Sequence, residues 1–115
     1  MEDTPQGPAL LDISEFARVE LRVARVLSAA RHPNAEKLLV LQVDAGGETR
    51  QLVAGIAGSY APEDLVDRLI VVVANLKPAT LRGERSEGML LAASSGETIS
   101  LLTVDRELPP GAKIR

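Results

Sequence analysis

Residues 19–30 read VELRVARVLSAA, and from Val19 to Val23 apolar side chains alternate with polar ones. A period of two residues is typical of a β-strand with one face buried and the other exposed. The apolar character continues to Ala30, so the predicted strand is long enough to bend around a barrel. The strand is expected to end at His32-Pro33-Asn34, because Pro33 has no N–H group to donate to a neighbouring strand.

Five further strands are predicted downstream. Residues 38–43 and 49–54 flank Asp44-Ala45-Gly46-Gly47, a turn whose glycines accept positive φ, so these two strands are expected to form a hairpin. Residues 69–74 are continuously apolar and mostly β-branched, which indicates a buried strand. Residues 88–93 are expected to form the fifth strand of the protein and residues 99–104 a sixth.

Short helices and polar connections separate these strands. Asp12 or Ser14 is a suitable cap for a short helix that carries Phe16, and Pro62 is placed to begin a second helix between the third and fourth strands. Residues 75–87 are expected to be a long polar connection, and residues 109–111, Pro-Pro-Gly, a rigid turn.

Five or six short strands, with a helix between the third and fourth, are typical of an OB-type barrel. We therefore predict an all-β protein, an OB-fold five-stranded Greek-key barrel with short helices. The length of 115 residues suits one domain, predicted to span residues 12–115. Residues 1–11 contain Pro5, Gly7 and Pro8 without an apolar period and are predicted to be a flexible N-terminal arm or linker.

The composition limits the classes of function. The formal charge of −3 and pI of about 5.1 argue against generic nucleic-acid binding but leave room for one local basic groove, because fields act over short distances. With Phe16 and Tyr60 as the only aromatic residues, RNA binding would use backbone and shape rather than base stacking. The absence of cysteine, of a long apolar run and of a signal-like start leads us to expect a cytoplasmic protein without membrane contact.

Two polar segments fall where OB barrels meet their ligands, on the loops between strands one and two and between strands four and five. In the first, Asn34 and Lys37 are suited to a sugar or base edge and a phosphate. An equally weighted alternative makes Asn34 a turn residue and leaves Lys37 solvated. In the second, Pro78 favours an extended Lys77 and so directs its side chain.

Three more residues of the second segment have two interpretations each. Arg82 suits a phosphate because its guanidinium matches pairs of oxygens, or it forms a surface ion pair with Glu84 or Glu87. Ser86 donates to an RNA oxygen or caps a turn. Met89 offers an apolar contact to a base or belongs to the core.

No arrangement of residues indicates catalysis. His32 is the only histidine and there is no cysteine to complete a metal site, so we expect no metal and no cofactor. Nothing marks Ser86 as an activated nucleophile, and no phosphate-cradling GxxxxGK loop is present. We therefore predict that the chain is not an enzyme, while it can be part of or auxiliary to one.

Several motifs in the same order and at the same spacing make the chain resemble the tRNA-binding domain family. The family includes the C-terminal domain of bacterial methionyl-tRNA synthetases and free-standing bacterial tRNA-binding proteins, and it is related to the endothelial-monocyte-activating polypeptide domain. The motifs are FARVELRV (16–23), HPNAEKL (32–38), VAGI (53–56), ANLKP (74–78), LRG (81–83) and SEGMLLA (86–92).

The resemblance implies an OB-fold with a C-terminal extension, usually a homodimer, that recognises tRNA shape with little sequence preference. It also implies which residues bind RNA, namely Asn34, Lys37, Asn75, Lys77, Arg82, Ser86 and Met89. The implied dimer interface includes Leu108, Pro109 and Pro110. This chain departs from the family pattern at Glu20, Ala24 and Ser59, and Glu84 and Glu87 bring negative charge near the RNA loop.

The favoured hypothesis is a structure-specific, largely sequence-independent tRNA-binding module. It would act as the appended domain of methionyl-tRNA synthetase or as a free-standing homolog in trans. The expected partners are tRNA, a second copy of the chain and an aminoacyl-tRNA synthetase. Two alternatives stay open: a CsaA-type peptide-binding export chaperone, and a pure dimerisation domain.

Overall fold

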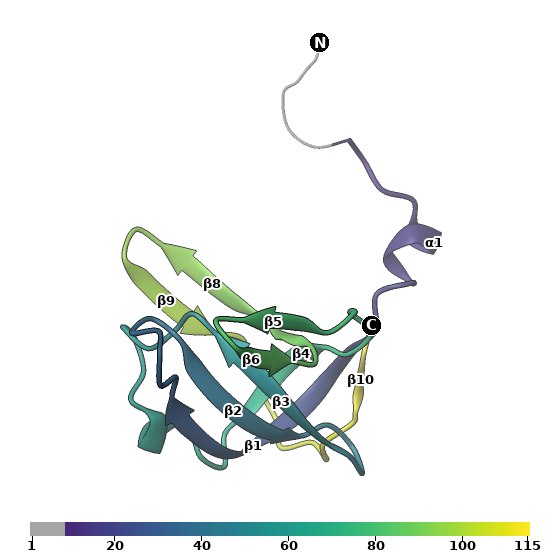
Figure 1. Ribbon diagram of the computed structural model, residues 1–115. Coiled ribbons are helices and arrows are strands. Elements are labelled where there is room, and N and C mark those ends of the chain that lie inside the picture. Colours follow the sequence, from purple (N-terminus) through teal and green to yellow (C-terminus); the bar gives the residue numbers. More distant parts are fainter. Residues whose placement is uncertain (1–8) are drawn as a thin grey trace.

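A computed structural model describes residues 9–115, and Figure 1 shows how the strands gather into one body with the first helix beside it. Most of the arm or linker predicted for residues 1–11 lies outside the described residues, and residues 9–11 are in neither helix nor strand. Helix α1 (Ile13–Phe16) has Asp12 as its N-cap, one of the two predicted caps. The Asp12 N–H donates to Glu15 Oε1 over 3.0 Å, which fixes the start of the helix.

Strand β1 (Leu21–Arg31) is shared between two neighbours. Its first half pairs antiparallel with β4 (Leu69–Val73), and its second half pairs antiparallel with β2 (Leu39–Asp44). The register with β2 shifts between Val26 and Ser28, which leaves one extra residue on β1. A bulge bends its strand and increases the local twist. The predicted bend is therefore present, and it carries β1 around the barrel.

The predicted hairpin of the second and third strands is confirmed. Strand β3 (Thr49–Ala54) pairs with β2 along its whole length. Alternate residues of β2 are completely buried, namely Leu39, Leu41 and Val43. The period of two in the sequence thus separates the core-facing side of β2 from its outer side.

The last strand of the barrel, β7 (Met89–Leu90), pairs with β4, so the sheet order is β3-β2-β1-β4-β7. Hydrogen bonds between β3 and the chain before β7 bridge the remaining gap. The Glu87 N–H donates to Gln51 O over 2.7 Å, and the Val53 N–H donates to Ser86 Oγ over 3.0 Å. Five antiparallel strands therefore form a nearly closed barrel, which confirms the predicted OB-fold.

The helix predicted between the third and fourth strands is a single 3₁₀ turn, η1 (Pro62–Asp64). It is followed by Leu65, whose side chain is completely buried in the core of the barrel. Burying a leucine side chain contributes about 2 kcal/mol to the free energy of unfolding. The short helix thus serves to place an apolar side chain in the core.

The connection predicted for residues 75–87 contains structure that its sequence did not reveal. Strands β5 (Ala79–Leu81) and β6 (Glu84–Ser86) form a separate two-stranded hairpin. Its turn residues, Arg82 and Gly83, have φ of 53° and 93°. Positive φ at both central positions is the geometry of a tight type I′ turn. Three-residue strands are too short to show a period in the sequence, so the hairpin was missed.

The region after β7 also differs from expectation. The predicted fifth strand is divided into β7 and β8 (Ala92–Ser95), and the predicted sixth strand is β9 (Thr98–Leu101), which ends earlier than residue 104. β8 and β9 pair only with each other around Gly96, and the hairpin extends away from the barrel in Figure 1. All four residues of β8 are exposed, whereas Ile99 and Leu101 of β9 pack against the core, so the hairpin contacts the barrel through β9 alone.

The C-terminal extension returns the chain to the start of β1. Strand β10 (Lys113–Ile114) pairs with β1, with Ile114 opposite Leu21. The Gly111 N–H donates to Val23 O over 2.7 Å, and the Val23 N–H donates to Ala112 O over 2.9 Å. These bonds bring the C-terminus close to α1 (Figure 1). No helix within residues 9–115 is long and apolar enough to cross a membrane.

Candidate nucleic-acid interface

The loop of residues 32–38 is organised around a buried histidine. The His32 side chain is 5% exposed. Its Nδ1 accepts the Asn34 N–H over 2.9 Å, and its Nε2 lies 3.0 Å from Leu81 O in β5. The loop is closed at its base, where the His32 N–H donates to Leu38 O over 3.1 Å. The side chain therefore ties this loop to the β5–β6 hairpin.

A second contact joins the same two elements. Arg82, at the tip of the hairpin, donates from Nη2 to Asn34 O over 3.1 Å. Of the two interpretations from the sequence, the ion pair with Glu84 or Glu87 is not the contact that holds this guanidinium. Since an arginine has five N–H donors, most of them stay available for an anion.

The loop and the hairpin tip enclose a shallow hollow of about 380 Å³. Asn34, Lys37 and Arg82 all line it, together with Glu36. Three of the seven predicted RNA-binding residues are thus brought together from positions up to 48 residues apart. Two cations around one hollow are suited to a phosphate group, although the Glu36 carboxylate reduces the net positive charge there.

Lys77 and Met89 are exposed but lie outside this hollow. Ala79 pairs with Ser86 and Leu81 pairs with Glu84, so Lys77 precedes the open end of the hairpin, whereas Arg82 is at its closed end. Three residues of strand span roughly 10 Å, so the backbone of Lys77 lies at the opposite end of the hairpin from that of Arg82. Met89 is 48% exposed at the start of β7, so its assignment to the core is wrong.

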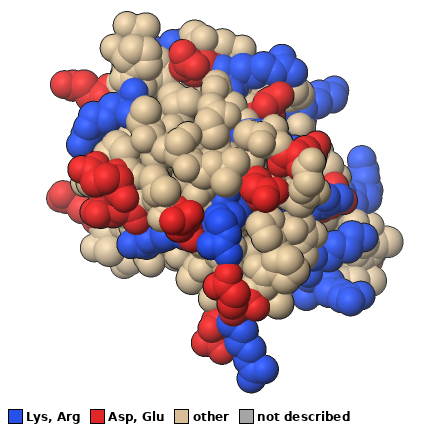
Figure 2. Space-filling model, turned by 90° about the horizontal axis from the view of Figure 1, so that it is seen from below, with Lys and Arg blue, Asp and Glu red and all other residues tan. Residues whose placement is uncertain are grey.

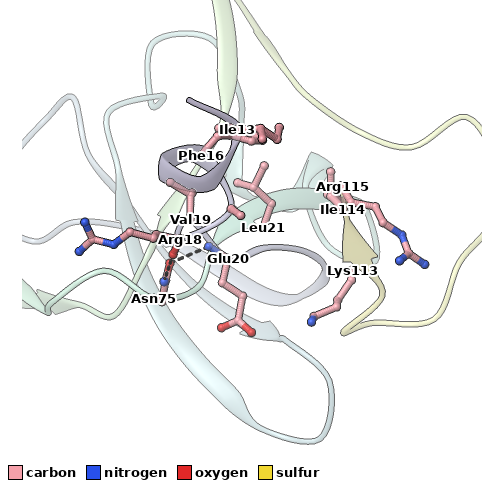
Figure 3. A pocket seen from close by; sticks show the side chains of 11 residues that line it. Ile13, Phe16, Arg18, Val19, Glu20, Leu21, Asn75, Lys113, Ile114 and Arg115 are labelled. Atoms are coloured by element: carbon pink, nitrogen blue, oxygen red, sulfur yellow. Dashed lines mark hydrogen bonds between the residues drawn. The ribbon is translucent and has the colours of Figure 1, made fainter. Parts of the chain in front are cut away.

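Asn75 has both polar groups of its side chain bonded to the backbone of the segment before β1. Its Oδ1 accepts the Glu20 N–H over 2.8 Å, and its Nδ2 donates to Arg18 O over 2.6 Å. Figure 3 shows these bonds at the edge of a second hollow, lined by residues of α1, β1 and β10. Asn75 therefore fixes the end of β4 to the start of β1, and it does not lie with Asn34, Lys37 and Arg82.

Ser86 is 5% exposed and its hydroxyl makes two hydrogen bonds within the protein. The Oγ accepts the Val53 N–H and donates to Gly88 O, both over 3.0 Å. For Ser86 to donate to an RNA oxygen, its hydroxyl would have to give up the bond to Gly88 O. The geometry thus gives Ser86 a role in closing the barrel, and its contact with RNA stays a prediction.

Sequence reasoning missed the residues of β3 that hold the hairpin in place. Arg50 donates to Ala74 O at one end of the 75–87 segment and, over 3.4 Å, to Glu87 O at the other end. The Gln51 amide nitrogen donates to Glu84 Oε1 over 3.2 Å and to Arg85 O over 2.8 Å. The signal available in the sequence was their place on the third strand, whose face carries ligands in OB-folds.

Acidic and basic side chains are mixed over the surface shown in Figure 2 and do not form a single basic field. One ion pair is Arg22 with Glu20, at 2.6 Å between Nη2 and Oε2. The hydrogen bond from Arg22 holds the pKa of Glu20 below its ordinary value of 4.5, against a smaller opposing effect of burial. Within residues 9–115, no group of three or more His, Cys, Asp or Glu side chains is placed to hold a metal ion.

Residues 21–113 match the family described as "Putative tRNA binding domain". The chain belongs to this family. The matched residues run from the first residue of β1 to the first residue of β10 and so include the barrel, both hairpins and the hollow beside Arg82. The family resemblance stated from the motifs is therefore confirmed.

This tRNA-binding domain is 61% identical over 104 residues to a methionine–tRNA ligase of Thermotoga maritima. The alignment covers 90% of this chain but only 16% of that protein. A methionine–tRNA ligase of Pyrococcus furiosus is 50% identical over 105 residues, which cover 91% of this chain and 14% of that protein. The chain thus spans about one sixth or less of the length of these relatives.

Solved structures resemble this tRNA-binding domain over nearly its whole length. A MetRS related protein from Pyrococcus horikoshii has a TM-score of 0.88 and 36% identity, over 94% of this chain and all of that one. The chaperone CsaA from Bacillus anthracis has a TM-score of 0.85 and 32% identity, over 93% of this chain and all of that one. The fold alone does not separate these two kinds of protein.

Proposed function

We propose that this domain binds folded tRNA by contacts to phosphates and to the shape of the RNA, with little dependence on sequence. It acts as a domain appended to a methionyl-tRNA synthetase or in trans beside one. The observation that carries the proposal is the hollow in which Asn34, Lys37 and Arg82 meet, at the loops where OB-folds meet their ligands. The family membership supports the same ligand.

The positions of the two aromatic residues favour recognition of backbone and shape. Phe16 lines the hollow beside α1, and Tyr60 lies beneath the Arg68 guanidinium, with its hydroxyl accepting the Leu101 N–H over 3.0 Å. Neither ring is among the residues that line the hollow beside Arg82. Single-strand binding that relies on stacked bases needs such rings at the site.

Within the proposed interface, the exposed side chains touch RNA and the bonded ones hold them in place. Lys37, Lys77 and Arg82 bind phosphates, Asn34 binds a sugar or base edge, and Met89 makes an apolar contact. Asn75 and Ser86 position the segment between β4 and β7. Chemistry on the tRNA is assigned to a synthetase, and the chain itself is proposed to be non-catalytic and to work in the cytoplasm.

The proposal includes a homodimer. The hollow of about 600 Å³ beside α1 and β10 is bordered by the exposed Phe16 and Val19, and the exposed Leu108 and Pro109 lie a few residues before β10. A second copy would cover apolar surface that is otherwise in contact with water. Two weak RNA sites on one body would also raise the effective concentration of the second contact.

Peptide binding is the second candidate, and the similarity to a CsaA chaperone favours it. The hollow beside α1 has apolar walls that would suit an apolar peptide segment. The candidate ranks lower because it gives no role to the cations at the other hollow. A chain that only dimerises would likewise leave these cations without a function.

The test is a titration of tRNA binding against salt, with single-stranded RNA and duplex DNA as competitors. Three phosphate contacts predict a log–log salt slope of roughly −2 to −3 and preference for folded tRNA. Equal competition by duplex DNA would contradict recognition of tRNA shape. Suppressed aggregation of an unfolded client, together with no tRNA binding at low salt, would favour the chaperone.

A further inference from the structure

We propose that His32 is a positioning residue for RNA binding, which holds the 32–38 loop and the β5–β6 hairpin in one fixed arrangement. The inference rests on the proposed function and deepens it. It assigns a role to the only histidine of the chain, which sequence analysis left without one. The imidazole does not touch RNA in this proposal, and it acts through Lys37 and Arg82.

The hydrogen bonds determine which ring nitrogen carries the proton. Leu81 O can only accept a hydrogen bond, so Nε2 must be the donor across the 3.0 Å contact. The Asn34 backbone N–H can only donate, so Nδ1 must be unprotonated. The fold therefore selects the neutral Nε2–H tautomer. Both nitrogens are occupied, which leaves neither for a metal ion or for proton transfer.

Together with Arg82, the imidazole completes a closed ring of contacts. His32 donates to Leu81 O, and Leu81 is covalently joined to Arg82. Arg82 donates to Asn34 O, while the Asn34 N–H donates back to His32. The two faces of the Asn34 backbone are thus held from two different residues. If the His32 bonds are lost, the bond from Arg82 to Asn34 O is the one contact of this set that still joins the loop to the hairpin.

This closed set of contacts fixes the backbone of the loop relative to the backbone of the hairpin, and so fixes where Lys37 and Arg82 start on the two sides of the hollow. Lys37 belongs to the loop that His32 begins, and Arg82 is at the tip of the hairpin that His32 reaches. Both are long, flexible side chains, so the main order in the site comes from the backbone that carries them. A site that is already arranged before RNA arrives loses less conformational freedom on binding.

Three variants separate the two bonds. His32→Asn places an oxygen near the position of Nδ1, so it keeps the Asn34 bond but is too short to reach Leu81 O. His32→Gln places an N–H donor near the position of Nε2, so it keeps the bond to the hairpin. His32→Ala loses both bonds. If the bond to the hairpin matters, the Gln variant retains tRNA affinity better than the Asn variant.

We expect His32→Asn to weaken tRNA binding about tenfold and His32→Gln to weaken it about threefold or less, since one buried hydrogen bond is at stake. Arg106→Ala is the matched control for a surface change. Arg106 is far from the 32–38 loop. The next residue, Glu107, pairs with Arg25, which lies six residues before the end of β1 and so about 20 Å from the loop along the strand. Binding by His32→Asn equal to that of the unchanged protein would overturn the proposal.

A double-mutant cycle with Arg82→Ala tests whether His32 acts through the hairpin. If it does, removing Arg82 costs less affinity in the His32→Asn background than in the unchanged protein, because the tip is already misplaced. Arg82→Ala alone should also reduce the salt slope by about one. Strictly additive losses would mean that His32 affects stability alone, and the proposal would fail.

A measurement without RNA keeps this inference separate from the proposed function. The nitrogen chemical shifts of His32 should report the Nε2–H tautomer in the unchanged protein. Hydrogen exchange of the Leu81–Glu84 turn should be faster in His32→Asn than in His32→Gln. Failure of tRNA binding with both signals present would reject the function alone, whereas the other tautomer would reject the role of His32 directly.

Discussion

At the scale of single residues, Arg82 combines a cation with an unfavourable backbone conformation. Its φ of 53° lies in the left-handed region, where residues other than glycine and asparagine are strained. Arginine at this position is an inferior choice for a tight turn, because Asn-Gly is the preferred pair. Retaining a strained arginine is consistent with a binding role for the guanidinium.

The first prediction is that Arg82→Asn separates stability from binding. We expect the free energy of unfolding to stay equal or to rise by up to about 1 kcal/mol, because asparagine tolerates positive φ. Affinity for tRNA should fall about fivefold to tenfold, since one phosphate contact is lost. Urea unfolding and a binding titration measure the two effects, and marked destabilisation would contradict this account of the turn.

The second prediction concerns pH. The lowered pKa of Glu20 means that its pair with Arg22 contributes stability above the ordinary value of 4.5 and loses it as pH falls through the lowered value. Glu20→Gln should therefore be less stable than the unchanged protein at pH 7, with the difference shrinking as the pH falls below 4.5 and through the lowered pKa of Glu20. Urea midpoints measured at pH 7 and along a series of more acidic pH values test this, and Glu97→Gln at the exposed β8–β9 turn is the control. A difference that persists in acid would refute it.

The sequence predicted the chemical type of the site residues better than it predicted what each one contacts. Asn75 and Ser86 belong to motifs of the family, and a motif does not distinguish a ligand contact from an internal bond. The partners of Asn75 are 55 and 57 residues away, and the barrel strand that Ser86 bonds is 33 residues away. Such pairings follow from closing the barrel and leave no local pattern.

At the scale of elements, two turns meet where the C-terminal extension joins the barrel. A methyl group added to Gly46, in the β2–β3 turn, would lie 2.6 Å from the Gly111 Cα. Gly111 belongs to the Pro109–Gly111 turn before β10. Both glycines also have positive φ, so this contact tolerates no larger residue at either position.

The third prediction follows from that contact. Gly46→Ala should lower the free energy of unfolding by about 3 kcal/mol, because both strain and a backbone collision are introduced. Gly47→Ala is a matched control, since Gly47 has a φ of 88° but open space around it, and it should cost about 1 kcal/mol. Thermal unfolding of both variants measures the difference. Equal losses would mean that the two turns are free to separate.

The longer strands were predictable because their burial alternates or is continuous over five or more residues. Strands β1 to β4 all follow this pattern within one or two residues of their expected ends. The β5–β6 hairpin was not predictable in the same way, since it is held by hydrogen bonds that involve Gln51 of β3, His32 and Arg82. Hydrogen bonds from polar side chains to distant parts of the chain set its place, and these do not produce a hydropathy period.

At the scale of the whole molecule, the fourth prediction tests the proposed homodimer. Phe16→Asp would place a charge in the hollow beside α1, and Leu108→Asp would do so in the segment before β10. We expect both to shift the protein toward monomer, with the larger effect for Phe16→Asp. Sedimentation equilibrium measures the mass. Because paired sites raise effective concentration, tRNA affinity should fall roughly tenfold in parallel.

A protein that is already monomeric before substitution would remove the dimer from the proposed function, and the hollow would then need another occupant. The unfolding curves of both variants serve as the control for folding. Because both residues are exposed, we expect little change in the free energy of unfolding. A variant that becomes monomeric because it has unfolded would not support the dimer.

Strand β1 begins beside the C-terminus and ends at the loop that carries Lys37. Its 11 residues span roughly 30 Å, less the effect of the bulge. A protein fused to this domain after β10 is therefore attached at the opposite end of β1 from the hollow beside Arg82. The barrel would then work as a rigid spacer that presents its cations away from the point of attachment. The distance between the fused protein and the bound RNA would be set by the fold, and not by the length of a linker.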